Sequence, residues 1–95
     1  MATYLIASIA VKNAEVYEEY KHKVPDTIAK YGGRYLVRGG EGEVVEGNWK
    51  TDRLIVLEFP DKNVFKSWYN SEDYNNLKAL RQNNAVSNIV IVEGI

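Results

Sequence analysis

The segment Arg53-Leu54-Ile55-Val56-Leu57-Glu58-Phe59 predicts a β-strand with apolar side chains on both of its faces. Successive strand residues point to opposite sides, so Ile55 and Leu57 share one face while Leu54 and Val56 share the other. A strand with one solvated face would instead alternate apolar and polar residues. We therefore expect this strand to lie in a sheet that is covered on both faces.

The same two-faced pattern recurs near both ends of the chain. The predicted strands Thr3–Val11 and Ser87–Glu93 are rich in β-branched and aromatic residues, and the last strand places Ile89 and Val90 on opposite faces. Arg34–Arg38 supplies one further strand. The sequence thus predicts four strands, at least three of which are apolar on both sides.

The first helix is expected to begin at Ala14, because Asn13 can cap it. The glycine pair 32–33 should end it, since glycine readily adopts the left-handed conformation that closes a helix. Pro25 lies inside this span and lacks a backbone N–H. We therefore expect the helix to be kinked at Pro25 or split at Val24.

The second half of the chain predicts two helices in tandem. Asp61 can cap a helix that runs through Tyr69, and Ser71 can cap another that runs to Arg81 or Asn84. Only a short polar connection separates the two. Together they form one helical unit between the third and fourth strands.

The predicted elements follow the order β-α-β-β-α-β. This order is typical of a ferredoxin-like α+β sandwich, with a four-stranded antiparallel sheet and both helical units on one face. The glycine-rich, acidic residues 39–48 are expected to form a loop that holds at most a short strand at 43–46. We find no linker or repeat, so residues 1–95 are expected to form a single domain.

Composition excludes several classes of function. A net charge of −1 provides no basic field for nucleic acid, and the third strand lacks the stacking aromatics of an RNA-recognition motif. The absence of cysteine excludes disulfides and thiolate metal sites. His22, the one histidine, falls opposite the apolar stripe of its helix and is expected at the surface rather than as a base or ligand. We expect no metal, no cofactor, no membrane contact and a cytoplasmic location.

The face of the sheet away from the helices needs a cover. Two helical units are wide enough for only one face of a four-stranded sheet. The other face would expose several hundred Å² of apolar surface, which soluble monomers rarely tolerate. We expect a homodimer through this sheet face, or else the strand ends and the segment 39–52 folded over it.

Arg81 and Glu58 are the charged residues that stand out within apolar patterns. Arg81 falls inside the apolar sector of its helix, where a buried charge needs a partner. Glu58 is a candidate partner in an ion pair that fixes helix to sheet. Alternatively, Arg81 binds a ligand carboxylate or enolate, and Glu58 is then a candidate catalytic base.

Four more residues are candidates for a ligand pocket, each with a plainer alternative. Arg38, expected on the strand face of Arg34 and Leu36, points into a pocket mouth or stays solvated. Trp49 is expected to cover a pocket or the dimer interface, or only to pack against neighbouring side chains. Two residues of one apolar helix stripe, Trp68 and Tyr69, belong to the core or to a pocket wall.

Several segments resemble a bacterial family labelled domain of unknown function 1330. They are Tyr31-Gly32-Gly33-Arg34-Tyr35-Leu36-Val37-Arg38-Gly39-Gly40, Glu46-Gly47-Asn48-Trp49, Arg53 through Glu58-Phe59-Pro60, Trp68-Tyr69-Asn70-Ser71-Glu72-Asp73-Tyr74, and Arg81 with Ala85. The resemblance implies a dimeric α+β barrel, a superfamily that includes cofactor-independent monooxygenases, isomerases, ligand-binding proteins and some haem enzymes. It implies no catalytic residue, and Lys50-Thr51-Asp52 departs from a pattern that often holds proline.

Two functions remain open. One is a non-catalytic protein that binds a small organic metabolite. The other is a cofactor-independent enzyme, of monooxygenase or isomerase type, acting on a small organic acid or enolisable carbonyl. An enclosed cavity of about 300 Å³ or more that contains Arg81 and Glu58 would favour the enzyme, whereas a fully packed interior would exclude both.

Overall fold

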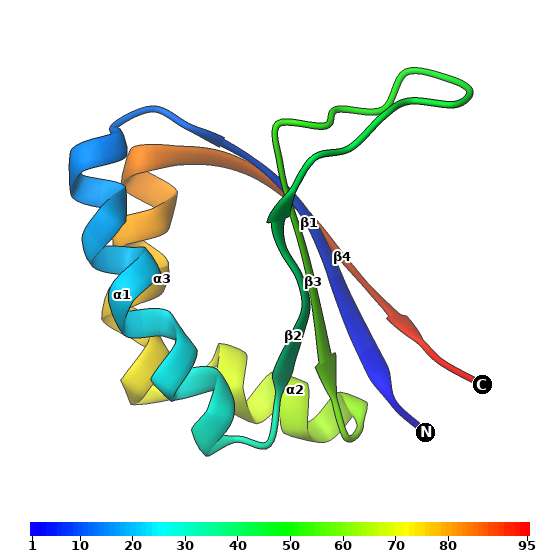
Figure 1. The fold of residues 1–95 in the computed structure, drawn as a ribbon. Helices are drawn as coiled ribbons and strands as arrows, with labels where there is room; N and C mark the ends of the chain where they lie inside the picture. Colours follow the sequence, from blue (N-terminus) through cyan, green and yellow to red (C-terminus); the bar gives the residue numbers. More distant parts are fainter.

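The structure is a computed structural model that describes all of residues 1–95. Its elements are β1 (Thr3–Val11), α1 (Ala14–Lys30), β2 (Arg34–Gly40), β3 (Arg53–Phe59), α2 (Lys62–Tyr69), α3 (Glu72–Asn84) and β4 (Ala85–Glu93). The strands form one antiparallel sheet in the order β2-β3-β1-β4. All three helices lie on the same side of that sheet (Figure 1). The ferredoxin-like α+β fold expected from the sequence is confirmed.

Each helix begins where a capping side chain is available. The Asn13 carboxamide accepts from the Val16 N–H at 3.2 Å, and the Asp61 carboxylate accepts from the Val64 N–H at 2.8 Å. Ser71 caps α3 in the same way. These bonds satisfy backbone donors that a helix start leaves free. None of the three helices combines the length and apolar character needed to cross a bilayer.

The helix α1 runs unbroken across Pro25, so the predicted split at Val24 is wrong. Proline removes the N–H that would bond the carbonyl of Lys21, four residues earlier. That carbonyl oxygen instead accepts from Nη2 of Arg38 at 2.6 Å. A guanidinium from β2 thus supplies the hydrogen bond that the proline removes, and the helix continues to Lys30.

The core lies between the helices and the inner face of the sheet. Leu5, Leu57 and Phe59 project from the strands, and they pack in one cluster with Ile28 of α1 and Trp68 of α2. Phe59 has no exposed surface, and its ring centroid lies 5.3 Å from that of Trp68. The odd-numbered face of β1 and β3 is therefore the inner one, as strand alternation requires.

The strand β2 contains two register shifts that decide which way its side chains point. Tyr35 pairs with Leu57, but Arg38 pairs with Ile55, so one residue is bulged between them. An extra residue moves the following side chains to the other face of the sheet. Arg38 therefore lies on the inner face with Tyr35, and the prediction that it shares a face with Arg34 and Leu36 is wrong.

The outer face of the sheet carries an apolar row that crosses all four strands. Val37 pairs with Val56, Val56 with Ile6, and Ile6 with Val90. The two residues at the sheet edges are well exposed, Val37 at 37% and Val90 at 55%. No helix covers this face (Figure 1).

Residues 41–52, here called the arm, form neither helix nor strand, so the predicted short strand at 43–46 is wrong. The arm projects beyond the ends of β2 and β3 on the side of the sheet away from the helices (Figure 1), and its residues 47–50 border a groove together with Ile6 and Val90 of the outer face. The Ser8 hydroxyl of β1 donates to the Lys50 carbonyl at 3.1 Å, and this hydrogen bond attaches the C-terminal part of the arm to the sheet. Two apolar side chains of the arm, Val45 and Trp49, are 88% and 69% exposed.

Candidate functional site

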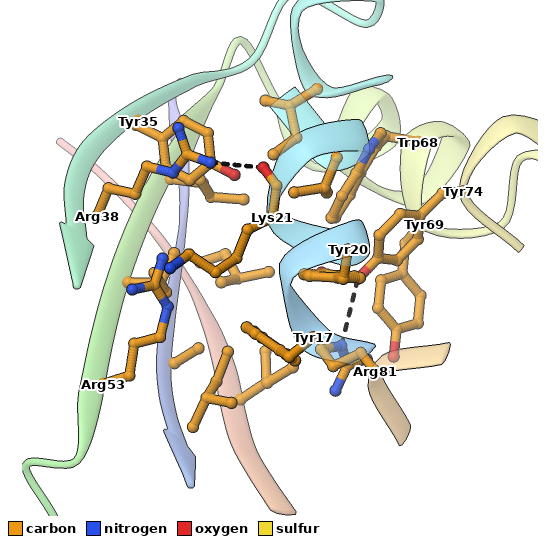
Figure 2. A pocket seen from close by; sticks show the side chains of 18 residues that line it. Tyr17, Tyr20, Lys21, Tyr35, Arg38, Arg53, Trp68, Tyr69, Tyr74 and Arg81 are labelled. Atoms are coloured by element: carbon orange, nitrogen blue, oxygen red, sulfur yellow. Dashed lines mark hydrogen bonds between the residues drawn. The ribbon is translucent and has the colours of Figure 1, made fainter. Parts of the chain in front are cut away.

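A pocket, here called the central pocket, lies between α1 and the inner face of the sheet (Figure 2). Its volume is about 40 Å³. Because a water molecule occupies about 30 Å³ in the liquid, this is room for one or two waters or for a carboxylate group. The space is far smaller than the roughly 300 Å³ expected for an enzyme pocket.

The charges around the central pocket are all of one sign. Four cationic side chains line it, namely Lys21, Arg38, Arg53 and Arg81, and no aspartate, glutamate or histidine does so. Lys21 is paired with Glu18 at 3.1 Å, so the uncompensated charge comes from the arginines. A water-poor site with unbalanced positive charge favours an anion.

Arg38 is fixed in the pocket wall by the local chemistry of two elements. The bulge in β2 turns its side chain to the inner face. Its Nη2 atom donates to the backbone carbonyl of Lys21, which Pro25 leaves without a helical partner. Its guanidinium carbon also lies 4.9 Å from the centre of the Tyr35 ring, within range of a cation–π interaction. Arg38 is therefore preorganised at the edge of the pocket that Lys21 also lines (Figure 2).

Arg53 follows the arm at the start of β3 and points to the inner face. Its Nε atom is buried and has no hydrogen-bond partner. The guanidinium packs against Gly39, which has a φ of +73° and where a Cβ would clash with Nη1. Such a donor costs free energy while it stays unpaired. Arg53 therefore has one guanidinium N–H without an acceptor at the central pocket, as Arg81 does.

The opposite end of the pocket is aromatic and largely satisfied. The hydroxyls of Tyr20 and Tyr74 lie 2.7 Å apart, and Nε of Arg81 donates to the Tyr74 hydroxyl at 3.3 Å. Trp68 donates its indole N–H to the Thr27 hydroxyl at 3.0 Å. Arg81 is only 3% exposed, yet its Nη2 atom has no partner.

Three tyrosines of the pocket are held in their neutral form by burial. Burial raises the pKa of Tyr17, Tyr20 and Tyr35 above the ordinary value of 10.0. For Tyr20 the neighbouring Tyr74 hydroxyl raises the pKa further. These three phenols therefore add no negative charge near the arginines at neutral pH, and they do not serve as general bases.

Glu58 does not belong to this pocket, and the expected ion pair with Arg81 does not form. Glu58 pairs with Arg34 across the outer face, where Arg34 Nε donates to Oε1 at 2.6 Å. This hydrogen bond lowers the pKa of Glu58. Strand alternation explains the error, because Glu58 follows the inward Leu57 and must point outward.

The remaining candidates separate into two groups. Trp68 and Tyr69 line the central pocket, and Lys78 lies 4.2 Å from the centre of the Tyr69 ring. Trp49 lies on the arm and lines a groove on the outer side of the sheet. His22 is exposed on α1, at the surface where the helix pattern placed it.

Sequence reasoning missed most of the polar residues that line the pocket, Lys21 and Arg53 among them. Arg53 alternates with Ile55 and Leu57 along one strand, so its inward direction was readable from the pattern. The pairing of Lys21 and Arg38 had only an indirect indication, a proline four residues after Lys21. Tyr17 and Tyr20 lie on the buried face of α1 among apolar side chains, so no feature of the sequence marked them as pocket residues.

Comparison with solved structures shows the same fold at low identity. A protein of unknown function from Rhodopseudomonas palustris, RPA0582, has a TM-score of 0.81 and 17% identity, covering 99% of this chain and 82% of its own. A dimeric ferredoxin-like protein of unknown function from Jannaschia sp. CCS1 has a TM-score of 0.74 and 10% identity, covering 99% and 100%.

A neighbour with an assigned activity is SnoaB from Streptomyces nogalater, a cofactor-independent oxygenase. It has a TM-score of 0.61 and 10% identity, covering 99% of this chain and 92% of its own. Identity this low shows the shared fold alone. No curated protein matches the sequence. A family model, in contrast, matches residues 2–95, and the chain therefore belongs to the family described as Domain of unknown function (DUF1330).

Proposed function

We propose that this protein is a homodimer that binds a small organic anion, a carboxylate or an enolate, in the central pocket. The observation that carries the proposal is the buried, unpartnered Nε of Arg53 in a pocket that has four cationic residues and no acid. A carboxylate oxygen would supply the missing acceptor in a charge-assisted hydrogen bond.

The size of the pocket limits what can enter. About 40 Å³ accepts a carboxylate group but not a whole metabolite. The rest of the ligand would extend past Lys21 and Arg38 toward solvent, since Arg38 is exposed and Lys21 partly so. The pocket then selects the ligand by its anionic group and places few constraints on the part of the ligand that extends into solvent.

Binding fits the geometry better than catalysis does. No carboxylate or histidine lines the pocket, and burial raises the pKa of Tyr17, Tyr20 and Tyr35, so none of these groups serves as a general base. The alternative is a cofactor-independent monooxygenase or isomerase, which the likeness to SnoaB favours. Such an enzyme would hold a reactive enolate against Arg53 and would turn over without added cofactor. Oxygen consumption with an enolisable substrate distinguishes the two.

The dimer part of the proposal rests on the outer face of the sheet. The apolar row Val37-Val56-Ile6-Val90 is left open to solvent in one copy of the chain. A second copy about a two-fold axis would cover it with the same surface. The Jannaschia neighbour is a dimeric ferredoxin-like protein, which supports this arrangement. The single-domain organisation and the cytoplasmic location stay predictions.

The binding test compares Arg53→Gln with wild type by calorimetry, using acetate, pyruvate and benzoate as probes. Loss of a charge-assisted hydrogen bond of about 1.5–3 kcal/mol predicts roughly 10- to 100-fold weaker binding. Lys23→Gln is the control, because it removes the same charge from an exposed site on α1. The proposal fails if no probe binds wild type, or if Arg53→Gln binds as tightly as wild type.

A further inference from the structure

The interior proline of α1 is connected to the central pocket through one hydrogen bond. Pro25 lies four residues after Lys21, whose backbone carbonyl accepts from Nη2 of Arg38 at 2.6 Å (Figure 2). Lys21 and Arg38 both line the central pocket. We infer that Pro25 is a positioning residue of this pocket: it frees an uncharged acceptor that fixes the Arg38 guanidinium, with its charge intact, at the edge of the anion site. This role rests on the proposed function, the binding of a small organic anion.

The acceptor is available because proline cannot complete the helix. In a regular α-helix the carbonyl of Lys21 would accept from the N–H of residue 25. Proline has no N–H, and its ring clashes with the carbonyl four residues earlier, so this oxygen has no helical donor. A backbone carbonyl without a partner favours another donor within reach. The bulge in β2 supplies that donor, because it turns Arg38 to the inner face.

The hydrogen bond fixes Arg38 without cancelling its charge. The acceptor is a neutral amide oxygen, and the second contact is the Tyr35 ring, whose centre lies 4.9 Å from the guanidinium carbon. None of the ion pairs in the structure includes Arg38, whereas Arg34 of the same strand pairs with Glu58. A carboxylate partner would also hold the guanidinium, but it would neutralise it. Arg38 therefore keeps its charge and its other N–H donors for a ligand.

The expected effect follows from the freedom that Arg38 would otherwise have. A long side chain samples many rotamers, and immobilising it during binding lowers affinity. Arg38 is exposed, so without the carbonyl only the Tyr35 ring would hold it. Pro25→Ala restores a backbone N–H, which bonds the Lys21 carbonyl in competition with Arg38. We expect a more mobile Arg38 side chain and acetate binding that is about 3- to 10-fold weaker.

The test compares Pro25→Ala with wild type in two measurements. The ¹⁵N–¹H heteronuclear NOE of Arg38 Nε, recorded without ligand, should be lower in the variant. That of Arg34 should not change, because its hydrogen bond to Glu58 remains. Calorimetry with acetate should show the weaker binding. Pro60→Ala, which replaces the other proline at an exposed position after β3, is the matched control and should leave both measurements unchanged.

A double substitution shows whether Pro25 and Arg38 act on the same carbonyl. Arg38→Met removes the guanidinium and leaves the Lys21 carbonyl without a donor. Pro25→Ala supplies a donor, so it should raise the urea midpoint more in the Arg38→Met background than in the wild-type background. Alanine is a good helix former, and the variants should therefore stay folded.

Failure of the proposed function can be told apart from failure of this role. If wild type does not bind acetate, the proposed function fails, and the role of Pro25 is decided by the NOE and the urea midpoints, which need no ligand. Three results would overturn the inference: an Arg38 side chain as ordered in Pro25→Ala as in wild type, equal changes of the urea midpoint in the two backgrounds, or acetate bound by Pro25→Ala as tightly as by a binding-competent wild type.

Discussion

Val90 offers the sharpest test of the proposed dimer. It ends the apolar row on the outer face, pairs with Ile6 of the neighbouring strand, and is 55% exposed in the single chain. In a symmetric dimer each copy contributes this side chain to the same interface, so a substitution acts twice. We expect Val90→Ala to weaken the dimer and Val90→Asp to abolish it at micromolar concentration.

The expected loss of dimer stability follows from the exposed fraction of Val90. Val90→Ala removes two carbon atoms, worth about 0.8 kcal/mol each when fully buried. Because 55% of the residue remains to be covered, the loss is about 0.9 kcal/mol per copy, or about 1.8 kcal/mol per dimer. This predicts a dimer dissociation constant raised about 20-fold. A buried, unpaired aspartate costs several kcal/mol per copy, which raises the constant by at least about a thousandfold.

The assay is sedimentation velocity over a dilution series. Wild type should sediment at about twice the chain mass of 10.8 kDa, and Val90→Asp at the chain mass. Ala79→Asp, which places the same charge on an exposed position of α3, should remain dimeric. The reasoning is refuted if wild type is a monomer throughout, or if Val90→Asp still forms dimers.

Two further predictions concern stability, both measured as urea midpoints. Gly33→Ala places a Cβ 2.6 Å from the Phe59 ring and should lower the free energy of unfolding by about 1–3 kcal/mol. Gly40→Ala, whose Cβ would have no atom nearer than 3.5 Å, should leave it unchanged. Equal losses in the two variants would contradict this. Burial raises the pKa of Tyr17 and Tyr20, so the folded state keeps protons that the unfolded chain loses above pH 10. The free energy of unfolding should therefore fall as pH rises beyond 10, by up to about 1.4 kcal/mol per pH unit for each tyrosine. Tyr20→Phe should remove one such contribution. A dependence of stability on pH that is the same in Tyr20→Phe as in wild type would contradict this.

The fold could be predicted because its determinants are local and periodic. Alternation along Arg53–Phe59 separates the two faces of the sheet, and the capping residues Asn13, Asp61 and Ser71 stand where the helices begin. The unbroken α1 was harder to foresee. Its proline is tolerated because Arg38, a residue 13 positions further along the chain, bonds the free carbonyl.

The site was predicted less well because it depends on register and on long-range pairing. One bulged residue in β2 turns Arg38 inward, and no feature of the sequence marks that bulge. Glu58 was assigned to Arg81 by charge alone, although its place between Leu57 and Phe59 already put it on the other face. The central pocket therefore contains Arg38 and Arg53, and Glu58 lies outside it.

The central claim, that Arg53 awaits an anionic ligand, is tested most directly by the Nε–Hε resonances of the four arginines in a ¹⁵N spectrum. Titration with acetate should move the Arg53 resonance downfield and to saturation, because a carboxylate then accepts from its unbonded Nε. Arg34, already bonded to Glu58, should not move. An Arg53 resonance that stays fixed, or drifts without saturating like the others, would contradict the account.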